Sequence, residues 1–211
     1  MIKIKEIEVF NFKGALRGMR NPLESWDKSD SYFSNNQNII GEKDLALALK
    51  LVKAGTDHSK FLRQIFVSMD ITAPEYWWKE YETYQVGTTE NSTSTMHKIT
   101  SRLLNENDFS FEDCQDRDFV NTQISYINKL IKKYQSLLAQ KKYEFAKQVW
   151  RELIQFLTMS FNYLRTCTLN YQVLRNMYFA RKNHKLSEWI EFCKIIKTLP
   201  YSELITIEGS K

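Results

Sequence analysis

The chain has 211 residues, enough for one domain or one domain with a long insertion, and its 43% of hydrophobic residues can bury a substantial core. The net charge of +5 is spread over single Lys and Arg residues and short pairs, which favours an anionic ligand over a DNA-binding stripe. No apolar run approaches the roughly 20 residues that cross a bilayer. The three widely spaced cysteines argue for a reducing compartment and against a zinc site. We expect a cytoplasmic protein with no membrane, nucleic-acid or metal partner.

Residues 2–10 alternate apolar and charged side chains, a pattern that predicts a half-buried strand followed by a short helix. The mostly polar stretch 21–41, which contains Pro22 and a run of Ser and Asn, predicts a loop. Residues 42–54 place apolar side chains at helical spacing and stop before Gly55, so we expect a helix there.

Residues 61–71 are rich in β-forming side chains and predict a strand. A helix over residues 75–84 is expected to follow, with Pro74 in its first turn. This helix carries five aromatic residues, namely Tyr76, Trp77, Trp78, Tyr81 and Tyr84. Such a cluster is typical of a core or a subunit interface, and the alternative is a wall that stacks a base or a flavin ring.

The second half of the chain is mainly helical. Apolar spacing predicts helices over residues 119–141 and 144–157, which form a helical hairpin over about residues 118–157 within a single domain. Residues 162–169 predict a strand and residues 186–196 a further helix. Strands and helices that mix without strict alternation indicate the α+β class.

Residues 168–181, read as a helix, carry polar groups where a plain core helix has none. Asn170 and Arg181 fall on one face and bracket an apolar stripe, while Gln172 and Asn176 form an amide pair on a second face. Burying the Arg181 charge unpaired costs several kcal/mol, so we expect a carboxylate, a phosphate, a carbonyl-rich ligand or water beside it. The alternative is that Arg181 points outward and complements the helix C-terminus.

Gly87 opens a polar segment of Thr, Ser, Asn and Glu that contains no apolar residue until Met96. Such a run is either a flexible loop or a ligand-facing turn whose hydroxyls bind a phosphate or a pyrimidine. His58 is either a structural or surface residue or a ligand-binding one. Glu80, on the aromatic helix, is a candidate partner for Arg181 or Lys79. Gly-rich phosphate loops, nucleophile elbows and zinc-protease signatures are missing from the sequence.

In their order and separation, these segments resemble the flavin-dependent thymidylate synthases. Residues 55–96 are similar to that family's turn, strand, Ala-Pro, helix and signature motif R-H-R-x-x-S-x-N-x-x-S-x-R-Y. Residues 168–181 are similar to its C-terminal helix, T-x-N-x-R-x-x-x-N-x-x-x-x-R, which is the more specific match. The resemblance implies an α+β fold with a central antiparallel sheet, a single domain over residues 1–211 and a homotetramer.

The resemblance also implies roles for individual residues. Arg181 matches the arginine that grips and polarises the uracil ring of dUMP, and Thr93 falls on the second serine of the signature motif, so these two take the catalytic roles. Nucleotide contacts are implied for Arg181, Thr88, Glu90, Asn91, Thr93, Thr95 and Glu80. FAD contacts are implied for His58, Asn170, Gln172 and Asn176.

The match departs from the family's motifs mainly at cationic positions. Residues 83–85 read Thr-Tyr-Gln in place of Arg-His-Arg, Gln172 replaces a flavin-binding arginine, and Thr95 replaces an arginine that clamps a phosphate. Thr88 and Thr93 replace serines but keep a hydroxyl. Each charge-assisted contact is worth roughly 1.5 to 3 kcal/mol, so standard methylation with FAD and methylenetetrahydrofolate is expected to be much slowed or absent.

The sequence alone does not decide between two functions. The first is an enzyme of pyrimidine deoxynucleotide metabolism, a transferase that binds a dUMP-like substrate and FAD in a pocket between subunits. The second is a non-catalytic binder that sequesters or senses a nucleotide or a nucleotide-derived signal, because binding tolerates lost transition-state groups better than catalysis does. A weaker third reading is an oligomeric structural protein. The neutral residues at the cationic positions of the motifs argue against the use of methylenetetrahydrofolate.

Overall fold

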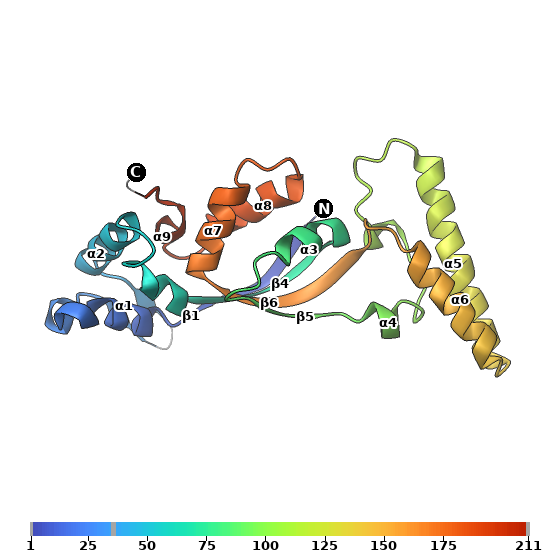
Figure 1. Cartoon of the computed structure of the whole chain (residues 1–211), viewed down its shortest axis with the longest axis horizontal. Coiled ribbons are helices and arrows are strands. Elements are labelled where there is room, and N and C mark those ends of the chain that lie inside the picture. Colours follow the sequence, from blue (N-terminus) through green and yellow to red (C-terminus); the bar gives the residue numbers. More distant parts are fainter. Residues whose placement is uncertain (1, 35–36, 210–211) are drawn as a thin grey trace. The chain divides into compact units, whose positions relative to one another are not determined.

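The computed structural model describes residues 2–34 and 37–209, and it confirms the α+β class (Figure 1). Its strands are β1 (Lys3–Phe10), β2 (Tyr32–Phe33), β3 (Asn38–Ile39), β4 (Phe66–Pro74), β5 (Thr89–Ser92) and β6 (Asn162–Asn170). Its helices are α1 (Phe12–Arg20), α2 (Glu42–Lys53), α3 (Glu75–Tyr81), α4 (Thr95–Lys98), α5 (Arg117–Ala139), α6 (Tyr143–Phe156), α7 (Tyr171–Arg181), α8 (Ser187–Ile196) and α9 (Glu203–Thr206). Short 3-10 helices are η1 (Asn21–Leu23), η2 (Trp26–Lys28), η3 (Lys60–Gln64) and η4 (Glu106–Asp108).

The main sheet is antiparallel, and its strands follow the order β1-β4-β6-β5. Alternate residues of the two middle strands are buried, as expected where one face of a sheet is covered. In β4 these are Val67, Met69, Ile71 and Ala73, and in β6 they are Arg165, Cys167 and Leu169. Arg165 therefore occupies the buried phase of a strand, a position that apolar residues normally take.

The chain divides into two compact units; four of the five boundaries between them fall inside strands of the main sheet, and the fifth follows the end of α3. Among the described residues, the hairpin unit comprises residues 2–3, 71–81 and 91–165. The α7 unit comprises residues 4–34, 37–70, 82–90 and 166–209. Each unit buries apolar residues of its own.

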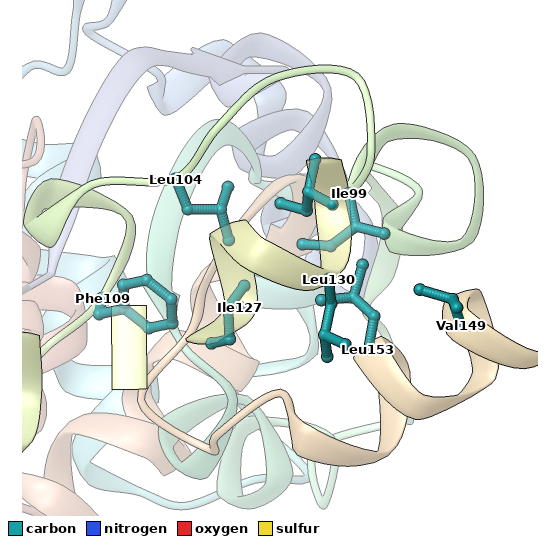
Figure 2. Close-up of a cluster of buried hydrophobic side chains, with 8 residues drawn as sticks. Ile99, Leu104, Phe109, Ile127, Leu130, Val149 and Leu153 are labelled. Carbon is teal, nitrogen blue, oxygen red and sulfur yellow. The ribbon is translucent and has the colours of Figure 1, made fainter. Parts of the chain in front are cut away.

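The hairpin unit is dominated by α5 and α6, which pack against each other (Figure 1). Val149 and Leu153 of α6 meet Ile127, Leu130 and Ile131 of α5, at the spacing that puts apolar side chains on one helix face. Figure 2 shows this cluster, which also takes in residues from the segment before α5, namely Ile99, Leu104 and Phe109. The apolar periodicity of the sequence thus reflects a real buried seam.

In the α7 unit, α1, α7, α9 and η3 pack around buried aromatic rings. The Phe12 ring meets the Tyr171 ring edge-on, with centroids 5.7 Å apart. The Tyr171 hydroxyl donates to the carbonyl of Pro200 at 2.5 Å. These contacts fix the first turn of α7 against α1 and the C-terminal segment.

An ion pair between Arg20 and Asp44 is almost fully buried in the same unit. Nε of Arg20 donates to Oδ1 of Asp44 at 2.6 Å, and the hydroxyls of Ser29 and Ser31 donate to Oδ2 at 2.6 and 2.5 Å. Burial alone would raise the pKa of Asp44, but the hydrogen bonds from Ser29, Ser31 and Arg20 outweigh it and hold the pKa below its usual value. The network ties the segment before α2 to α1 and α2.

Several predicted elements differ in extent from those observed. Residues 60–64 form η3 and not the start of a strand, because Phe61 and Leu62 are buried in a helical turn and tertiary packing overrides their β-propensity. Pro74 closes β4 and does not lie in the first turn of the helix. The aromatic helix ends at Tyr81, not at residue 84, and the chain then turns toward Gly87, whose φ is +84°.

Two stretches predicted as loops contain short elements. The stretch 21–41 forms η1, η2 and a pair of two-residue strands, in which Tyr32 lies opposite Ile39, although residues 35–36 lie outside the described part. The polar segment 87–96 contains β5 and the start of α4. Within residues 2–34 and 37–209, no helix combines the length and the apolar character that a membrane crossing requires.

Candidate functional site

The structure places the candidate residues in two groups, one in each unit. In the α7 unit lie His58, Thr88, Glu90, Asn170, Gln172, Asn176 and Arg181. In the hairpin unit lie Glu80, Asn91, Thr93 and Thr95.

Arg181 is the last residue of α7, and its guanidinium is half-buried among aromatic side chains. Its Nε donates to the hydroxyl of Tyr84 at 3.0 Å, and its Nη1 lies 3.0 Å from Nε2 of His184. The guanidinium carbon also lies 4.9 Å from the centroid of the Trp189 ring, within cation–π range. Arg181 is therefore held by its own chain and does not extend freely into water.

Asn170 does not belong to the helix, which corrects the placement of its side chain on the same helical face as Arg181. It is the last residue of β6 and the N-cap of α7, and its Oδ1 accepts a hydrogen bond from the backbone N–H of Val173 at 3.0 Å. A strand that runs directly into a helix leaves the cap residue extended, and Asn is a favoured N-cap. The amide nitrogen lies close to Gly87, where a Cβ atom would approach it to 2.9 Å.

The amide pair expected on α7 is present. Nε2 of Gln172 donates to Oδ1 of Asn176 at 3.0 Å, and Oε1 of Gln172 accepts from the Ser59 hydroxyl at 3.3 Å. Gln172 and Ser59 are buried, whereas Asn176 and His58 are exposed. Because Ser59 follows His58 directly, this contact brings the turn that carries His58 next to the first turns of α7.

Two further candidates lie at the edge of β5 in the α7 unit. The hydroxyl of Thr88 donates to the carbonyl of Tyr84 at 2.6 Å, so it closes the turn that follows α3. Glu90 lies on β5 with a half-buried side chain. Tyr84 therefore binds Arg181 through its hydroxyl and accepts, at its carbonyl, the hydrogen bond from Thr88 that closes this turn.

A hydroxyl-lined cavity of about 280 Å³ lies in the hairpin unit. Its walls are formed by the end of the polar segment, by the cations that follow this segment and by parts of β4 and β6. Its walls include Thr72, Thr93, Ser94, Thr95, Lys98, Ser101, Arg102, Asp108, Phe161, Asn162 and Leu164. Two of the residues expected to contact a nucleotide, Thr93 and Thr95, thus line one cavity.

Local hydrogen bonds fix the walls of this cavity. The backbone N–H of Thr93 donates to the carbonyl of Leu164 at 2.9 Å, which leaves the Thr93 hydroxyl outside the strand ladder. Arg102 forms a bidentate pair with Asp108, with Nη1 to Oδ2 at 2.8 Å. Burial tends to raise the pKa of Asp108, but the hydrogen bonds from Arg102 and from the Asn105 backbone outweigh it and lower the pKa. Arg102 is paired with Asp108, and Lys98 is the second cation in this wall and is exposed.

A buried cluster that the sequence analysis missed lies in the same unit as the cavity. The guanidinium of Arg165 lies 4.3 Å from the Trp78 ring centroid, and its Nη2 lies 3.9 Å from Oε2 of Glu75. Burial raises the pKa of Tyr163, and the hydrogen bond with Thr95 partly offsets this effect. The sequence signal for the burial of Arg165 is its position two residues before Cys167, because alternate residues of a strand face the same side of the sheet.

The aromatic helix α3 is mainly core. Trp77, Trp78 and Tyr81 are at most 2% exposed, and Nε1 of Trp78 donates to the carbonyl of Ala73 at 2.9 Å. This burial favours the core interpretation of the aromatic cluster over a stacking platform. Glu80, on the same helix, is half-buried, and Asn91 on β5 is exposed. No trio of His, Cys, Asp or Glu side chains suited to holding a metal is found in the described part of the chain.

Comparison with known proteins gives a consistent result for the fold. No family model and no curated protein sequence matches the chain. Thymidylate synthase X from Helicobacter pylori, in a structure with FAD and dUMP, is 17% identical, with a TM-score of 0.64 over 96% of this chain and 94% of that chain. A second structure of that flavin-dependent enzyme, complexed with FAD and dUMP, gives a TM-score of 0.65 at 17% identity over 98% and 100% of the two chains.

The UMP/dUMP methylase PolB from Streptomyces cacaoi, bound with 5-Br dUMP, is 15% identical, with a TM-score of 0.62 over 99% of this chain and 96% of that chain. These matches span nearly the whole of each chain at low sequence identity. The chain therefore has the fold of the flavin-dependent thymidylate synthases, as the resemblance in its sequence motifs implied.

Proposed function

We propose that this protein binds a pyrimidine nucleotide of the dUMP type, uses FAD, and acts as a transferase in deoxynucleotide biosynthesis in the cytoplasm. The observation that carries the proposal is the cavity that places the hydroxyls of Thr93, Ser94 and Thr95 beside Lys98. Solved structures with the same fold hold dUMP or 5-Br dUMP. Hydroxyls and one ammonium group are suited to the polar edge of a pyrimidine and to a phosphate.

Each candidate residue has a role in this proposal. Thr93 and Arg181 take the catalytic positions, and the Arg181 guanidinium stabilises negative charge that develops on the uracil ring. We assign nucleotide contacts to Arg181, Thr88 and Glu90 in the α7 unit and to Glu80, Asn91, Thr93 and Thr95 in the hairpin unit. Residues 1–211 form one domain of a homotetramer, in which neighbouring subunits complete the nucleotide site.

FAD contacts fall to His58, Asn170, Gln172 and Asn176. The amide oxygen of Asn170 caps α7, and Gln172 bonds with Ser59 and Asn176, so His58 and Asn176 are the exposed residues of the four. Amide and imidazole groups fit the polar edge of an isoalloxazine ring better than a pyrophosphate, which favours arginine and lysine. When bound, FAD supplies hydride transfer.

The second candidate function is a non-catalytic binder that sequesters or senses a nucleotide. Its support is the way Arg181 is held, with hydrogen-bonding contacts to Tyr84 and His184 and a ring contact with Trp189. Gln172 and Thr95, which stand at cationic positions of the resembled motifs, carry no charge. Fewer cations weaken transition-state stabilisation more than ground-state binding.

Three measurements on the purified protein test the proposal. Calorimetric titration with dUMP is expected to show saturable binding, and titration with FAD is expected to give a protein-bound flavin spectrum. No heat with dUMP would contradict nucleotide binding, and a colourless protein after FAD addition would contradict the flavin part. Release of tritium from 5-tritiated dUMP, with methylenetetrahydrofolate and reductant present, separates the functions: release supports the enzyme, and binding without release supports the binder.

A further inference from the structure

The positive charge of the protein is concentrated in the helical hairpin. Residues 129–151 contain seven cations and one acid, Glu144, which gives the segment a net charge of +6. The remaining 23 cations and 24 acids of the chain leave a net charge of −1 outside it. We call these seven side chains the basic hairpin surface: Lys129, Lys132, Lys133, Lys141, Lys142, Lys147 and Arg151.

All seven side chains of the basic hairpin surface are exposed. In the part of the chain that the structure describes, none of them forms an ion pair. Lys129 stands three and four residues before Lys132 and Lys133, and Lys147 stands four residues before Arg151, so like charges are helix neighbours. Such pairs destabilise a helix, and their retention without acidic partners is typical of a surface that meets an external anion.

The cations of the basic hairpin surface are distributed over α5, α6 and the turn between them. On α5, Lys129, Lys132 and Lys133 point away from the face that buries Ile127 and Leu130. The turn between the helices carries Lys141 and Lys142, and α6 then runs back along α5 (Figure 1). The hairpin thus carries exposed cations on both helices and on the turn that joins them.

An aromatic ring accompanies the cations on α6. Tyr143 is 62% exposed and stands four and eight residues before Lys147 and Arg151, which places the three side chains along one edge of the helix. Phe145, 61% exposed, lies two residues further on and faces another side. The exposed rings do not form one apolar face that could insert into a lipid surface, so charge is the dominant attraction.

We propose that the basic hairpin surface binds single-stranded nucleic acid, with its cations on the phosphate backbone and Tyr143 stacked on a base. Exposed cations release counterions from a phosphate backbone, and a flat ring beside them offers stacking that tolerates any base. This activity is separate from the nucleotide site proposed above. The shared chemistry is the phosphate backbone, and RNA and DNA are distinguished by experiment.

The test uses the full chain and fluorescein-labelled oligomers of about 20 nucleotides, one RNA and one DNA, in anisotropy titrations at salt concentrations from roughly 50 to 200 mM. Lys129→Gln with Lys132→Gln is expected to weaken binding about fivefold at low salt and to reduce the salt slope by about 1.4, the value for two phosphate contacts on a single strand. The matched control, Lys50→Gln with Lys53→Gln, changes the charge equally at exposed positions of α2 with the same spacing and is expected to stay within about twofold of wild type.

Two further arms make the assignment specific. Tyr143→Leu keeps apolar bulk but removes the flat ring, and it is expected to weaken single-strand binding severalfold while leaving duplex binding unchanged. Excess dUMP is expected not to displace the oligomer. The proposal is overturned if neither oligomer binds at low salt, if the α2 control weakens binding as much as the α5 variant, or if a duplex binds more tightly than single strands. Binding to phosphatidylserine vesicles in place of oligomers would also overturn it.

Discussion

The hydroxyl of Tyr84 accepts a hydrogen bond from Nε of Arg181 at 3.0 Å, and this bond links the end of α7 to the segment after α3. The Arg181 guanidinium carbon also lies 5.7 Å from the centroid of the Tyr84 ring. In the signature motif that the sequence resembles, a histidine stands at this position. The substitution keeps a hydrogen-bonding ring but removes a group that can carry a proton near neutral pH.

Tyr84→Phe is expected to lower the free energy of unfolding by about 1 kcal/mol, because it removes the acceptor of a hydrogen bond from a half-buried charged group. Urea denaturation at neutral pH measures the change. Tyr143→Phe is the matched control, since it removes a tyrosine hydroxyl from an exposed position on α6, and it is expected to change little. Equal unfolding free energies for Tyr84→Phe and wild type would show that the hydrogen bond contributes no net stability.

Gly87→Ala is expected to destabilise the protein by about 2 kcal/mol, through a positive φ and a close contact with the N-cap of α7. The φ of Gly87 is +84°, and an added Cβ would lie 2.9 Å from the Asn170 amide nitrogen. Gly55→Ala separates the two effects, because Gly55 has a φ of +107° with no atom within 4 Å of an added Cβ. Thermal melts of both variants should show the larger loss for Gly87→Ala, and the reverse order would exclude the contact as a cause.

Asp44→Asn is expected to cost about 3 kcal/mol at neutral pH, because it leaves the buried Arg20 charge without its carboxylate. The pKa of Asp44 is below its usual value in the folded state, so the ionised carboxylate stabilises the protein above the unfolded pKa of 3.8. That contribution is lost as the pH falls through the lower folded pKa. Urea midpoints between neutral pH and about pH 3 should fall more steeply for wild type than for Asp44→Asn. The exposed Asp57→Asn control should follow wild type.

The regular elements were predictable where the pattern of burial is local. The apolar spacing that predicted helices over residues 119–141 and 144–157 corresponds to the buried seam of α5 and α6. The strands over residues 2–10 and 162–169 were predicted from alternation and composition, and β1 and β6 agree within two residues. The turn at η3 was not predictable in this way, since its burial depends on packing against α1 and α7.

The candidate site was predictable in residue type but not in contacts. The sequence indicated that Arg181 needs a partner, yet Tyr84 lies 97 positions away along the chain. The N-cap role of Asn170 follows from a strand that passes directly into a helix, which a helical reading of residues 168–181 concealed. The cavity lined by Thr93 combines residues 93–108 with residues of β4 and β6 that are distant in sequence, so no single local motif indicates all of its walls.

The proposed nucleotide site depends most directly on the Thr93 hydroxyl in the hydroxyl-lined cavity. Calorimetric titration of dUMP into Thr93→Val, Thr93→Ser and wild type tests it, because the backbone hydrogen bond of Thr93 to Leu164 does not involve the side chain. Thr122→Val, at an exposed position on α5, is the control for the loss of a hydroxyl elsewhere. We predict that Thr93→Val weakens dUMP binding by about tenfold, the equivalent of one good hydrogen bond, while Thr93→Ser and Thr122→Val bind as wild type does. Equal affinity for dUMP in Thr93→Val and wild type would contradict the account.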